Sequence, residues 1–238
     1  MPAPALICLP PAGGGPGLFR PWQRLDPAVV APSIPGREAR FREPPATDLN
    51  RLADRIALEI APALPARHGL FGYSMGGTLA LLLARRLMAM GRPAPEALFL
   101  LGALAPERLH EGTESLPDLD SRAFWAEIAR IGGTPDEILR DAEMRALFEP
   151  ALRQDFRLCA SYRHPGDGFR LSCPVHVFVA GDDHLVDAGS VADWARHTTG
   201  PVHLHLLEGG HMLPATAFAA LPARIRQLWP GQVARVAG

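Results

Sequence analysis

Cysteine is scarce in this sequence, with three residues in a chain of 238. Cys8, Cys159 and Cys173 are scattered without the spacing of metal ligands and stand beside apolar residues. This pattern excludes a disulfide framework and a cysteine-based metal site. We expect three buried structural thiols in a reducing compartment, and therefore a cytoplasmic protein.

Long apolar runs and blocks of like charge are also lacking. No run approaches the length of a membrane span, and no basic segment precedes a long apolar stretch, so we expect neither membrane association nor a signal peptide. The net charge is −1 without a basic block, so we expect no nucleic-acid partner. Hydrophobic residues make up 47% of the chain, enough for a sizeable core, and the length favours one domain over residues 1–238.

What the sequence does contain is the pentapeptide Gly-Tyr-Ser-Met-Gly at residues 72–76, between a short apolar run and a helical pattern. Strand, Gly-x-Ser-x-Gly and helix is the context of a nucleophile elbow, in which the glycines leave room for a very sharp turn. Such a turn holds the Ser74 hydroxyl above the sheet edge, near the N–H groups of a helix start. Taken alone, the motif also fits a glycine-rich helix start with an incidental serine.

Short apolar runs alternate with helical patterns over the first hundred residues. This order predicts a parallel sheet with crossover helices, and hence an α/β fold with helices on both faces of a mostly parallel sheet. A helix beginning at Leu49 has Asp48 as its predicted N-cap. The expected strands are 5–9, 29–31, 70–71, 97–101, 174–180 and 202–207, and the other expected helices are 18–25, 78–90, 191–196 and 217–228.

Residues 106 to about 170 depart from this alternation. Strand-like runs disappear, and short helical segments are expected at 122–131, 135–140, 143–147 and 152–162. A helical insertion between sheet strands is the usual place for a lid over an active site, so we expect a lid subdomain here. Extra helices packed on the sheet are the alternative, and the sequence does not separate the two.

Two further candidate groups follow expected strands. Asp182 and Asp183 come after the strand at 174–180, and His211 follows the last strand. The order Ser, Asp, His, each at a strand end, is that of an α/β-hydrolase triad. A serine hydroxyl needs an imidazole to take its proton, and the imidazole needs a carboxylate to fix its tautomer. We expect Ser74, Asp183 and His211 to be catalytic, with Asp183 favoured over Asp182 by its spacing from the strand end.

The glycine-rich loop after the first strand, residues 10–15, is a candidate oxyanion loop. Proline has no N–H, which excludes Pro10 and Pro11 as donors. Ala12 is therefore the leading candidate, with Met75, directly after the serine, supplying the second N–H. A flexible glycine loop without a task is the alternative.

The other histidines have weaker claims. His203 and His205 alternate along the last expected strand, and with His211 they could imitate a metal cluster. No Asp, Glu or Cys at matching spacing completes such a site, so we expect no metal. His68 and His184 are expected to be solvated loop residues.

With these residues in place, the chain resembles the type II (editing) thioesterases associated with nonribosomal peptide and polyketide synthetases. The resemblance runs from Leu6 to Leu213. Its markers are Leu-Pro-Pro-Ala-Gly-Gly at 9–14, Phe-Arg-Pro-Trp at 19–22, Pro-Gly-Arg-Glu at 35–38, Glu-Pro-Pro at 43–45, the Ser74 motif and Gly-Gly-His at 209–211. One departure is Tyr73, where histidine is usual, and we expect such departures to shape the pocket mouth.

This resemblance implies hydrolysis of acyl groups from the phosphopantetheine thiol of carrier proteins, to clear misprimed or stalled synthetases. It implies an acyl-Ser74 intermediate with Ala12 and Met75 as oxyanion donors. No cofactor is expected beyond the phosphopantetheine on the substrate, and the carrier is expected to be a separate protein met by a monomer. Carriers of this family are generally acidic, so a patch with Arg37, Arg40 and Arg42 could meet one, although a solvated charged loop fits those arginines equally well.

Three rival functions remain open. A general esterase or lipase shares the triad, and an acyltransferase would use the same acyl-enzyme with water excluded. A non-catalytic binding module on this scaffold would not need all of Ser74, Asp183 and His211, which argues against it.

Overall fold

A parallel sheet forms the centre of the molecule, as predicted. The computed structural model describes residues 3–132, 134, 136–187 and 189–230. Within these ranges the sheet has six strands in the order β2-β1-β3-β4-β5-β6, and all pairings are parallel. The strands are β1 (Ala5–Leu9), β2 (Val29–Val30), β3 (His68–Tyr73), β4 (Leu98–Leu101), β5 (Val175–Ala180) and β6 (Val202–Leu207). Because all strands run the same way, the segments that follow them meet at one edge.

Helices connect the strands in the order expected of crossover units. The α-helices of the described residues are α1 (Arg20–Leu25), α2 (Leu49–Ile60), α3 (Met75–Ala89), α4 (Ser121–Ile131), α5 (Asp136–Arg140), α6 (Ala142–Ser161), α7 (Ser190–Trp194) and α8 (Ala215–Gln227). Short 3₁₀ turns are η1 (Pro16–Phe19), η2 (Glu38–Arg40), η3 (Ala61–Ala63), η4 (Pro106–Arg108), η5 (Leu116–Asp118) and η6 (Ala195–His197). The predicted N-cap is confirmed, since the Asp48 side chain accepts a hydrogen bond from the Arg51 amide at 2.9 Å.

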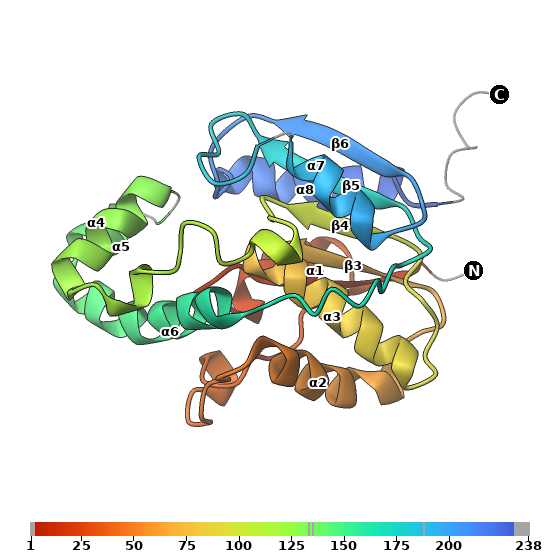
Figure 1. Ribbon diagram of the computed structural model, residues 1–238, viewed down its shortest axis with the longest axis horizontal. Helices are drawn as coiled ribbons and strands as arrows, with labels where there is room; N and C mark the ends of the chain where they lie inside the picture. Colours follow the sequence, from red (N-terminus) through yellow and green to blue (C-terminus); the bar gives the residue numbers. More distant parts are fainter. Residues whose placement is uncertain (1–2, 133, 135, 188, 231–238) are drawn as a thin grey trace.

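Alternate residues of the strands face two different hydrophobic layers, as the pleat of a strand requires. On one face Ile7 packs with side chains of α2, α3 and α7. On the other face Leu6 packs with side chains of α1 and α8, where the rings of Trp22 and Phe218 stack with centroids 4.6 Å apart. Helices therefore cover both faces of the sheet (Figure 1).

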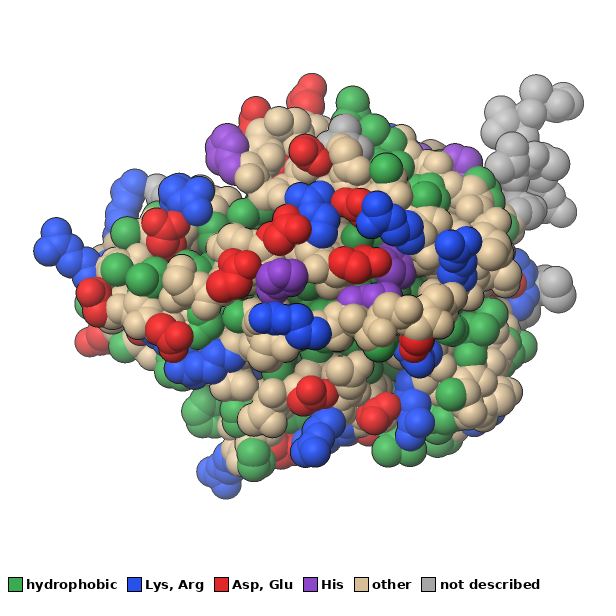
Figure 2. Space-filling view, viewed as in Figure 1, with side chains coloured by type: hydrophobic (Ala, Val, Ile, Leu, Met, Phe, Trp, Pro, Cys, Tyr) green, Lys and Arg blue, Asp and Glu red, His purple; other side chains and the backbone are tan. Residues whose placement is uncertain are grey.

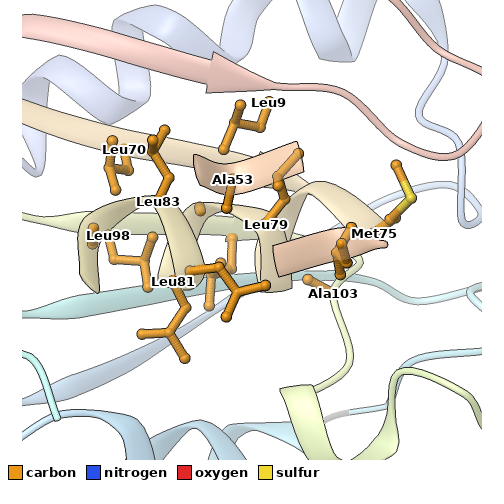
Figure 3. Packing of buried hydrophobic residues seen from close by; sticks show 14 of the residues in the cluster. Leu9, Ala53, Leu70, Met75, Leu79, Leu81, Leu83, Leu98 and Ala103 are labelled. Carbon is orange, nitrogen blue, oxygen red and sulfur yellow. The ribbon is translucent and has the colours of Figure 1, made fainter. Parts of the chain in front are cut away.

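The layer between α3 and the sheet is built mainly from leucines. Leu79 and Leu83 of α3 are fully buried beside Leu70 of β3 and Ala53 of α2 (Figure 3). Burying one such side chain contributes roughly 1.5–3 kcal/mol. This packing fixes the first turn of α3 relative to the ends of β1 and β3, where the site is assembled.

The chain between β4 and β5, residues 106–170, forms a helical insertion with a core of its own. Figure 1 shows α4, α5 and α6 standing to one side of the sheet. The insertion core comprises Leu116, Phe124, Trp125, Ile128, Ile131 and Phe156. A cavity lies between the insertion and the carboxyl edge of the sheet, lined by residues of both.

One expectation for the insertion was wrong. Two helices were predicted at 143–147 and 152–162, but a single helix, α6, runs through Pro150. Proline removes one backbone hydrogen bond from a helix interior. Here an ion pair between Glu149 and Arg153, at 2.7 Å, spans the proline, and Phe156 anchors the following turn in the insertion core. Pro135, the expected first residue of the preceding helix, lies outside the described residues.

His68 was also misassigned as a solvated loop residue. It is the first residue of β3 and has no exposed surface. Its Nδ1 lies 3.2 Å from the carbonyl oxygen of Pro65, and burial lowers its pKa. The predicted strand began two residues too late, because His68 and Gly69 are not apolar residues and the prediction relied on an apolar run. His184 is exposed, as expected.

The three cysteines are buried free thiols, as predicted. Burial raises the pKa of Cys173 to about 11, which keeps that thiol protonated and unreactive. Among the described helices, none combines the length and the apolar character needed to cross a membrane.

The edge strand β6 places two histidines against a third on β5. His176 stacks on His203 and His205 with centroids 4.8 and 5.2 Å apart, and its Nδ1 lies 3.0 Å from Nε2 of His205. These rings do not join His211 in a group with metal-ligand distances among the described residues. Burial, reinforced by the neighbouring imidazoles, lowers the pKa of His176 to about 4.

This pKa makes the folded protein sensitive to mild acid. Between pH 4 and about 6.5 the unfolded imidazole binds a proton that the folded one does not, so stability falls as the pH drops through this window. We expect His176→Leu to remove up to about 3 kcal/mol of this pH-dependent loss. Urea unfolding at pH 7 and pH 4.5 measures the effect, with the exposed His184→Gln as the matched control. Identical pH dependence in wild type and His176→Leu would contradict the assignment.

Candidate active site

Ser74 occupies a strained turn between β3 and α3. Its φ and ψ of 52° and −119° lie where residues with a side chain are rarely found. A Cβ at Gly72 would stand 2.3 Å from the carbonyl oxygen of Gly76, so the turn closes only because residue 72 is glycine. The Ser74 amide donates to the Leu101 carbonyl at 2.8 Å. The predicted strand–elbow–helix geometry is therefore present.

His211 connects the serine to a carboxylate. Its Nε2 lies 3.0 Å from Ser74 Oγ, and its Nδ1 lies 2.9 Å from Asp183 Oδ2. A carboxylate beside Nδ1 holds the proton on that nitrogen and leaves Nε2 as the acceptor for the serine hydroxyl. The three residues predicted from strand-end positions thus form one hydrogen-bonded chain.

Asp183, and not its neighbour Asp182, is the residue that reaches His211. The other carboxylate oxygen of Asp183 accepts from the amides of Leu185 at 2.8 Å and Val186 at 3.1 Å. Burial opposes ionisation of this carboxyl, but the bonds from His211 and the two amides outweigh it and lower its pKa. Asp182 is exposed. The Asp183 carboxylate is therefore held charged and fixed in direction.

Tyr73 holds the backbone of His211, a role the sequence did not indicate. Its buried hydroxyl donates to the His211 carbonyl at 2.9 Å and accepts from the Leu213 amide at 2.9 Å. Burial raises the pKa of this phenol, so the hydroxyl stays protonated. Tyr73 also lines the cavity beside Ser74, which agrees with the expectation that this position shapes the pocket.

The glycine-rich loop after β1 lies directly beside the elbow. A Cβ at Gly76 would stand 2.4 Å from the carbonyl oxygen of Leu9, so only glycine lets β1 and α3 approach this closely. The loop turns at Pro11–Gly14, with the Gly14 amide donating to the Pro11 carbonyl at 2.9 Å. Ala12 and Met75, the two predicted donors, line the same cavity as Ser74.

Residues far along the chain hold this loop. The Asp155 carboxylate, on α6, accepts from the Gly13 amide at 2.6 Å and forms an ion pair with Arg37. Arg37 also donates to the Gly14 carbonyl. Sequence reasoning placed Asp155 in a lid segment (Arg153–Phe156) but predicted no contact with this loop, although an aspartate between apolar helix positions was the available signal.

The suggested surface patch of arginines is largely absent. The Arg37 side chain is 10% exposed and paired with Asp155, and that of Arg40 is 15% exposed and paired with Glu43 and Glu59. Bidentate hydrogen bonding to Glu43 raises the pKa of Arg40. Arg37 and Arg40 therefore form ion pairs within the protein and are not available as a surface patch. The sequence analysis did not predict these pairs.

A cavity of about 620 Å³ opens in front of Ser74. Its walls are predominantly apolar and come from the sheet edge, the glycine loop and the insertion. Its insertion side includes Trp125, Ile128, Ile131, Ile138, Phe148, Leu152, Phe156 and Cys159. A pocket of this size and character fits an apolar chain whose reacting end lies at the hydroxyl.

One group of potential metal ligands lies elsewhere: Glu107, His164 and His197, with ligand atoms within 4.8 Å of one another. His197 Nε2 lies 2.9 Å from the Glu107 carboxylate, and its Nδ1 is buried without a hydrogen-bond partner in the described chain. Metal-bound histidines usually donate from their second nitrogen. The arrangement favours a Glu–His hydrogen bond, and none of the three residues lines the cavity.

Comparison with known proteins places this geometry in a family. Residues 4–227 match the thioesterase domain model. Thioesterase PikA5 of Streptomyces venezuelae is 37% identical over 214 residues, covering 87% of this chain and 74% of that protein.

Two solved structures are similar over nearly the whole chain. The RedJ thioesterase of the prodiginine pathway in Streptomyces coelicolor has a TM-score of 0.83 and 31% identity, covering 95% of this chain and 89% of that one. The type II thioesterase BorB of the borrelidin biosynthetic cluster has a TM-score of 0.79 and 34% identity, covering 95% and 91%. With its α/β-hydrolase fold, the chain therefore belongs to the thioesterase domain family, groups with the type II thioesterases of nonribosomal peptide and polyketide biosynthesis, and is a thioester hydrolase.

Proposed function

We propose that this thioesterase hydrolyses acyl groups from the phosphopantetheine thiol of a carrier protein, through an acyl-Ser74 intermediate. The observation that carries the proposal is the chain Ser74–His211–Asp183 at the mouth of an apolar cavity. Two further similar structures, ClbQ and YbtT, come from NRPS/PKS pathways, and this supports a carrier protein as the substrate class. The proposed task is to unload misprimed or stalled synthetases.

In the first half-reaction His211 Nε2 takes the Ser74 proton while Oγ attacks the thioester carbonyl carbon. The carbonyl electron pair moves to oxygen, and the amides of Ala12 and Met75 donate to the oxyanion. The carbon–sulfur bond then breaks, and the thiolate takes the proton from the imidazolium. The acyl group remains on Ser74 as an ester, and the carrier leaves with a free thiol.

In the second half-reaction His211 removes a proton from water, which attacks the ester carbonyl. The tetrahedral intermediate collapses, the carboxylic acid leaves, and Ser74 Oγ regains its proton from the imidazolium. Asp183 keeps its charge throughout and stabilises the imidazolium. The proposed reaction requires water and no cofactor or metal.

The insertion serves as a lid in this scheme. Residues 106–170 supply one wall of the cavity, so their position decides which acyl chains fit. A thioester carbonyl is more electrophilic than an amide carbonyl and its thiolate leaves easily. Catalysis therefore depends mainly on positioning the thioester and on the oxyanion donors. The apolar lining favours apolar acyl groups over charged or strongly polar ones.

The carrier is a separate macromolecule, and we propose that a monomer of this chain meets it, since one chain supplies all groups of the triad. On the face seen in Figure 2, arginines and acidic side chains are interspersed, and no large patch of one sign covers the described residues there.

The buried free thiols support a reducing compartment, and we propose the cytoplasm.

Two adjacent aspartates give a matched test of the triad. We expect Ser74→Ala and Asp183→Asn each to lower kcat for acetyl-loaded carrier by about 10⁴-fold, because the first removes the nucleophile and the second no longer fixes the His211 tautomer. Asp182→Asn should stay within about threefold of wild type, since its carboxylate does not reach His211. Intact-mass spectrometry of the carrier measures the loss of the acyl group.

A matched simple ester separates the alternatives. Hydrolysis of the ester without unloading of the carrier would make the protein a general esterase, and transfer of the acyl group to an added alcohol or amine in preference to water would make it an acyltransferase. Equal activity of Asp182→Asn and Asp183→Asn would contradict the assigned acid.

The cavity predicts a chain-length effect. Ile131→Trp adds volume at the end of α4, so we expect kcat/KM for octanoyl-carrier to fall at least about tenfold, roughly 1.4 kcal/mol. Acetyl-carrier hydrolysis should change by less than about threefold, because a short acyl group does not reach the added ring. Leu147→Trp, at a side chain 63% exposed and outside the cavity, is the control. An equal loss with both acyl groups would show that this wall does not hold the chain.

A further inference from the structure

The turn that carries Ala12 has a defined type. Pro11 and Gly14 are its first and last residues, joined by the Gly14 amide and the Pro11 carbonyl at 2.9 Å. Gly13, in the third position, has a φ of +75°, the conformation that a type II turn requires there. Ala12 occupies the second position. The direction of its N–H therefore depends on how the backbone groups of the two following glycines are held.

Two buried charged side chains hold those groups. Asp155 is 1% exposed, and one of its oxygens accepts from the Gly13 amide at 2.6 Å. Its other oxygen pairs with the Arg37 guanidinium, which also donates to the Gly14 carbonyl. Burial raises the pKa of the Asp155 carboxyl, and the Arg37 charge and the Gly13 amide oppose this shift. The contacts end on the N–H of Gly13 and the carbonyl of Gly14, two consecutive residues of the turn next to the proposed oxyanion donor.

The loop that carries Arg37 has a strained backbone and contacts the segment that follows the turn. Glu38 has a φ of 45°, and besides Ser74 it is the one residue other than glycine with positive φ in the described part of the chain. Its carboxylate accepts from the Gly17 amide at 2.8 Å. A Cβ at Gly15 would stand 2.4 Å from the same carboxylate oxygen, so the Glu38 side chain lies close against the loop backbone at Gly15. Strain of this kind persists only where the surroundings impose it, and it concentrates at functional sites.

We propose that Arg37 and Asp155 are positioning residues that orient the oxyanion donor Ala12 by holding the N–H of Gly13 and the carbonyl of Gly14. The inference rests on the proposed function, because it assumes that the Ala12 N–H meets the oxyanion. It assigns a catalytic consequence to an ion pair that is remote in sequence from the triad and touches none of its members.

The same helix also borders the acyl cavity. Leu152 and Phe156 of α6 line that cavity and lie close to Asp155 in sequence. A Cβ at Gly13 would stand 2.6 Å from Leu152 Cδ1, so the helix packs directly on the turn. The wall that contacts the acyl chain and the group that orients the oxyanion donor thus belong to one rigid element.

The first test is Asp155→Asn, which keeps the side-chain shape but removes the charge that holds Arg37. We expect kcat for acetyl-carrier to fall by about 100-fold with KM within about threefold, because the oxyanion donor acts in the transition state and not in substrate binding. Gln154→Ala is the matched control on α6. It removes a bond of 2.8 Å to the Ala46 carbonyl, away from the turn, and should leave kcat within about threefold.

Arg37→Lys provides a second variant if Asp155→Asn fails to fold. It keeps a positive charge near Asp155 but cannot reproduce the forked contact to the carboxylate and the Gly14 carbonyl. We expect kcat to fall by about tenfold with KM unchanged. Unchanged kcat in folded Asp155→Asn and Arg37→Lys would overturn the proposal.

A double-mutant cycle tests whether the pair acts through Ala12. Proline is favoured at the second position of a type II turn, so Ala12→Pro removes the N–H while keeping the turn. We expect Ala12→Pro to lower kcat by about 100-fold to 1,000-fold. Adding Asp155→Asn to Ala12→Pro should lower it by less than about threefold more, because the donor it positions is already gone.

The outcomes separate the two levels of the account. Full additivity of Ala12→Pro and Asp155→Asn would overturn the positioning role while leaving Ala12 as a donor. Full activity of Ala12→Pro would remove Ala12 from the oxyanion hole and overturn the positioning proposal with it. Loss of carrier hydrolysis in Ser74→Ala is independent of both results, and retention of activity there would overturn the proposed function itself.

Discussion

The close contact between the end of β1 and the first turn of α3 is the constraint on which the site depends. A Cβ at Gly76 would stand 2.4 Å from the Leu9 carbonyl oxygen and 2.7 Å from that of Pro10. A Cβ at Gly72 would likewise stand too close to the Gly76 carbonyl oxygen. Two glycines thus allow three backbone segments to meet at one point. The tight turn that results holds Ser74 in a strained backbone conformation, with a φ of 52°. At this point Ser74, Met75 and Ala12 line one cavity, where the proposed mechanism places the reacting carbonyl.

Two sets of ties fix the groups around that point. His211 is held at Nδ1 by Asp183 and at its backbone carbonyl by the Tyr73 hydroxyl. The glycine loop is held by Arg37 and Asp155. In the proposed mechanism the first set controls proton transfer, and the second lies beside the proposed oxyanion donor. The insertion contributes to the second set alone, which links the walls of the acyl cavity to charge stabilisation and not to the acid–base groups.

The sequence was most informative where the chemistry is local. The Ser74 elbow follows from five consecutive residues, and Asp183 and His211 follow from their places after apolar strands. Ala12 was chosen because two prolines lack N–H groups; it lines the cavity, and its role as a donor stays a prediction. In contrast, the Arg37–Asp155 pair joins positions 118 residues apart (155 minus 37), and no periodicity relates them. For the same reason Arg37 was assigned to the surface, although Asp155 of α6 holds it inside, while Arg40 is largely covered by its pairs with Glu43 of the same loop and Glu59 of α2.

Errors in the secondary structure have equally specific causes. Pro150 suggested a helix end, but the Glu149–Arg153 pair and the insertion core carry α6 through it. His68 suggested a loop, but pairing with β1 places it inside the sheet. In each case tertiary contacts overrode a local preference.

The central claim is that Ser74 forms the covalent bond with the acyl group. Titration with a fluorophosphonate, which modifies activated serines, measures this most directly when residual carrier hydrolysis is compared with the fraction of protein labelled. The account predicts one label per chain, located on Ser74 by peptide mass spectrometry, and loss of carrier hydrolysis in proportion to labelling. Carrier hydrolysis that persists when Ser74 is fully labelled would contradict it.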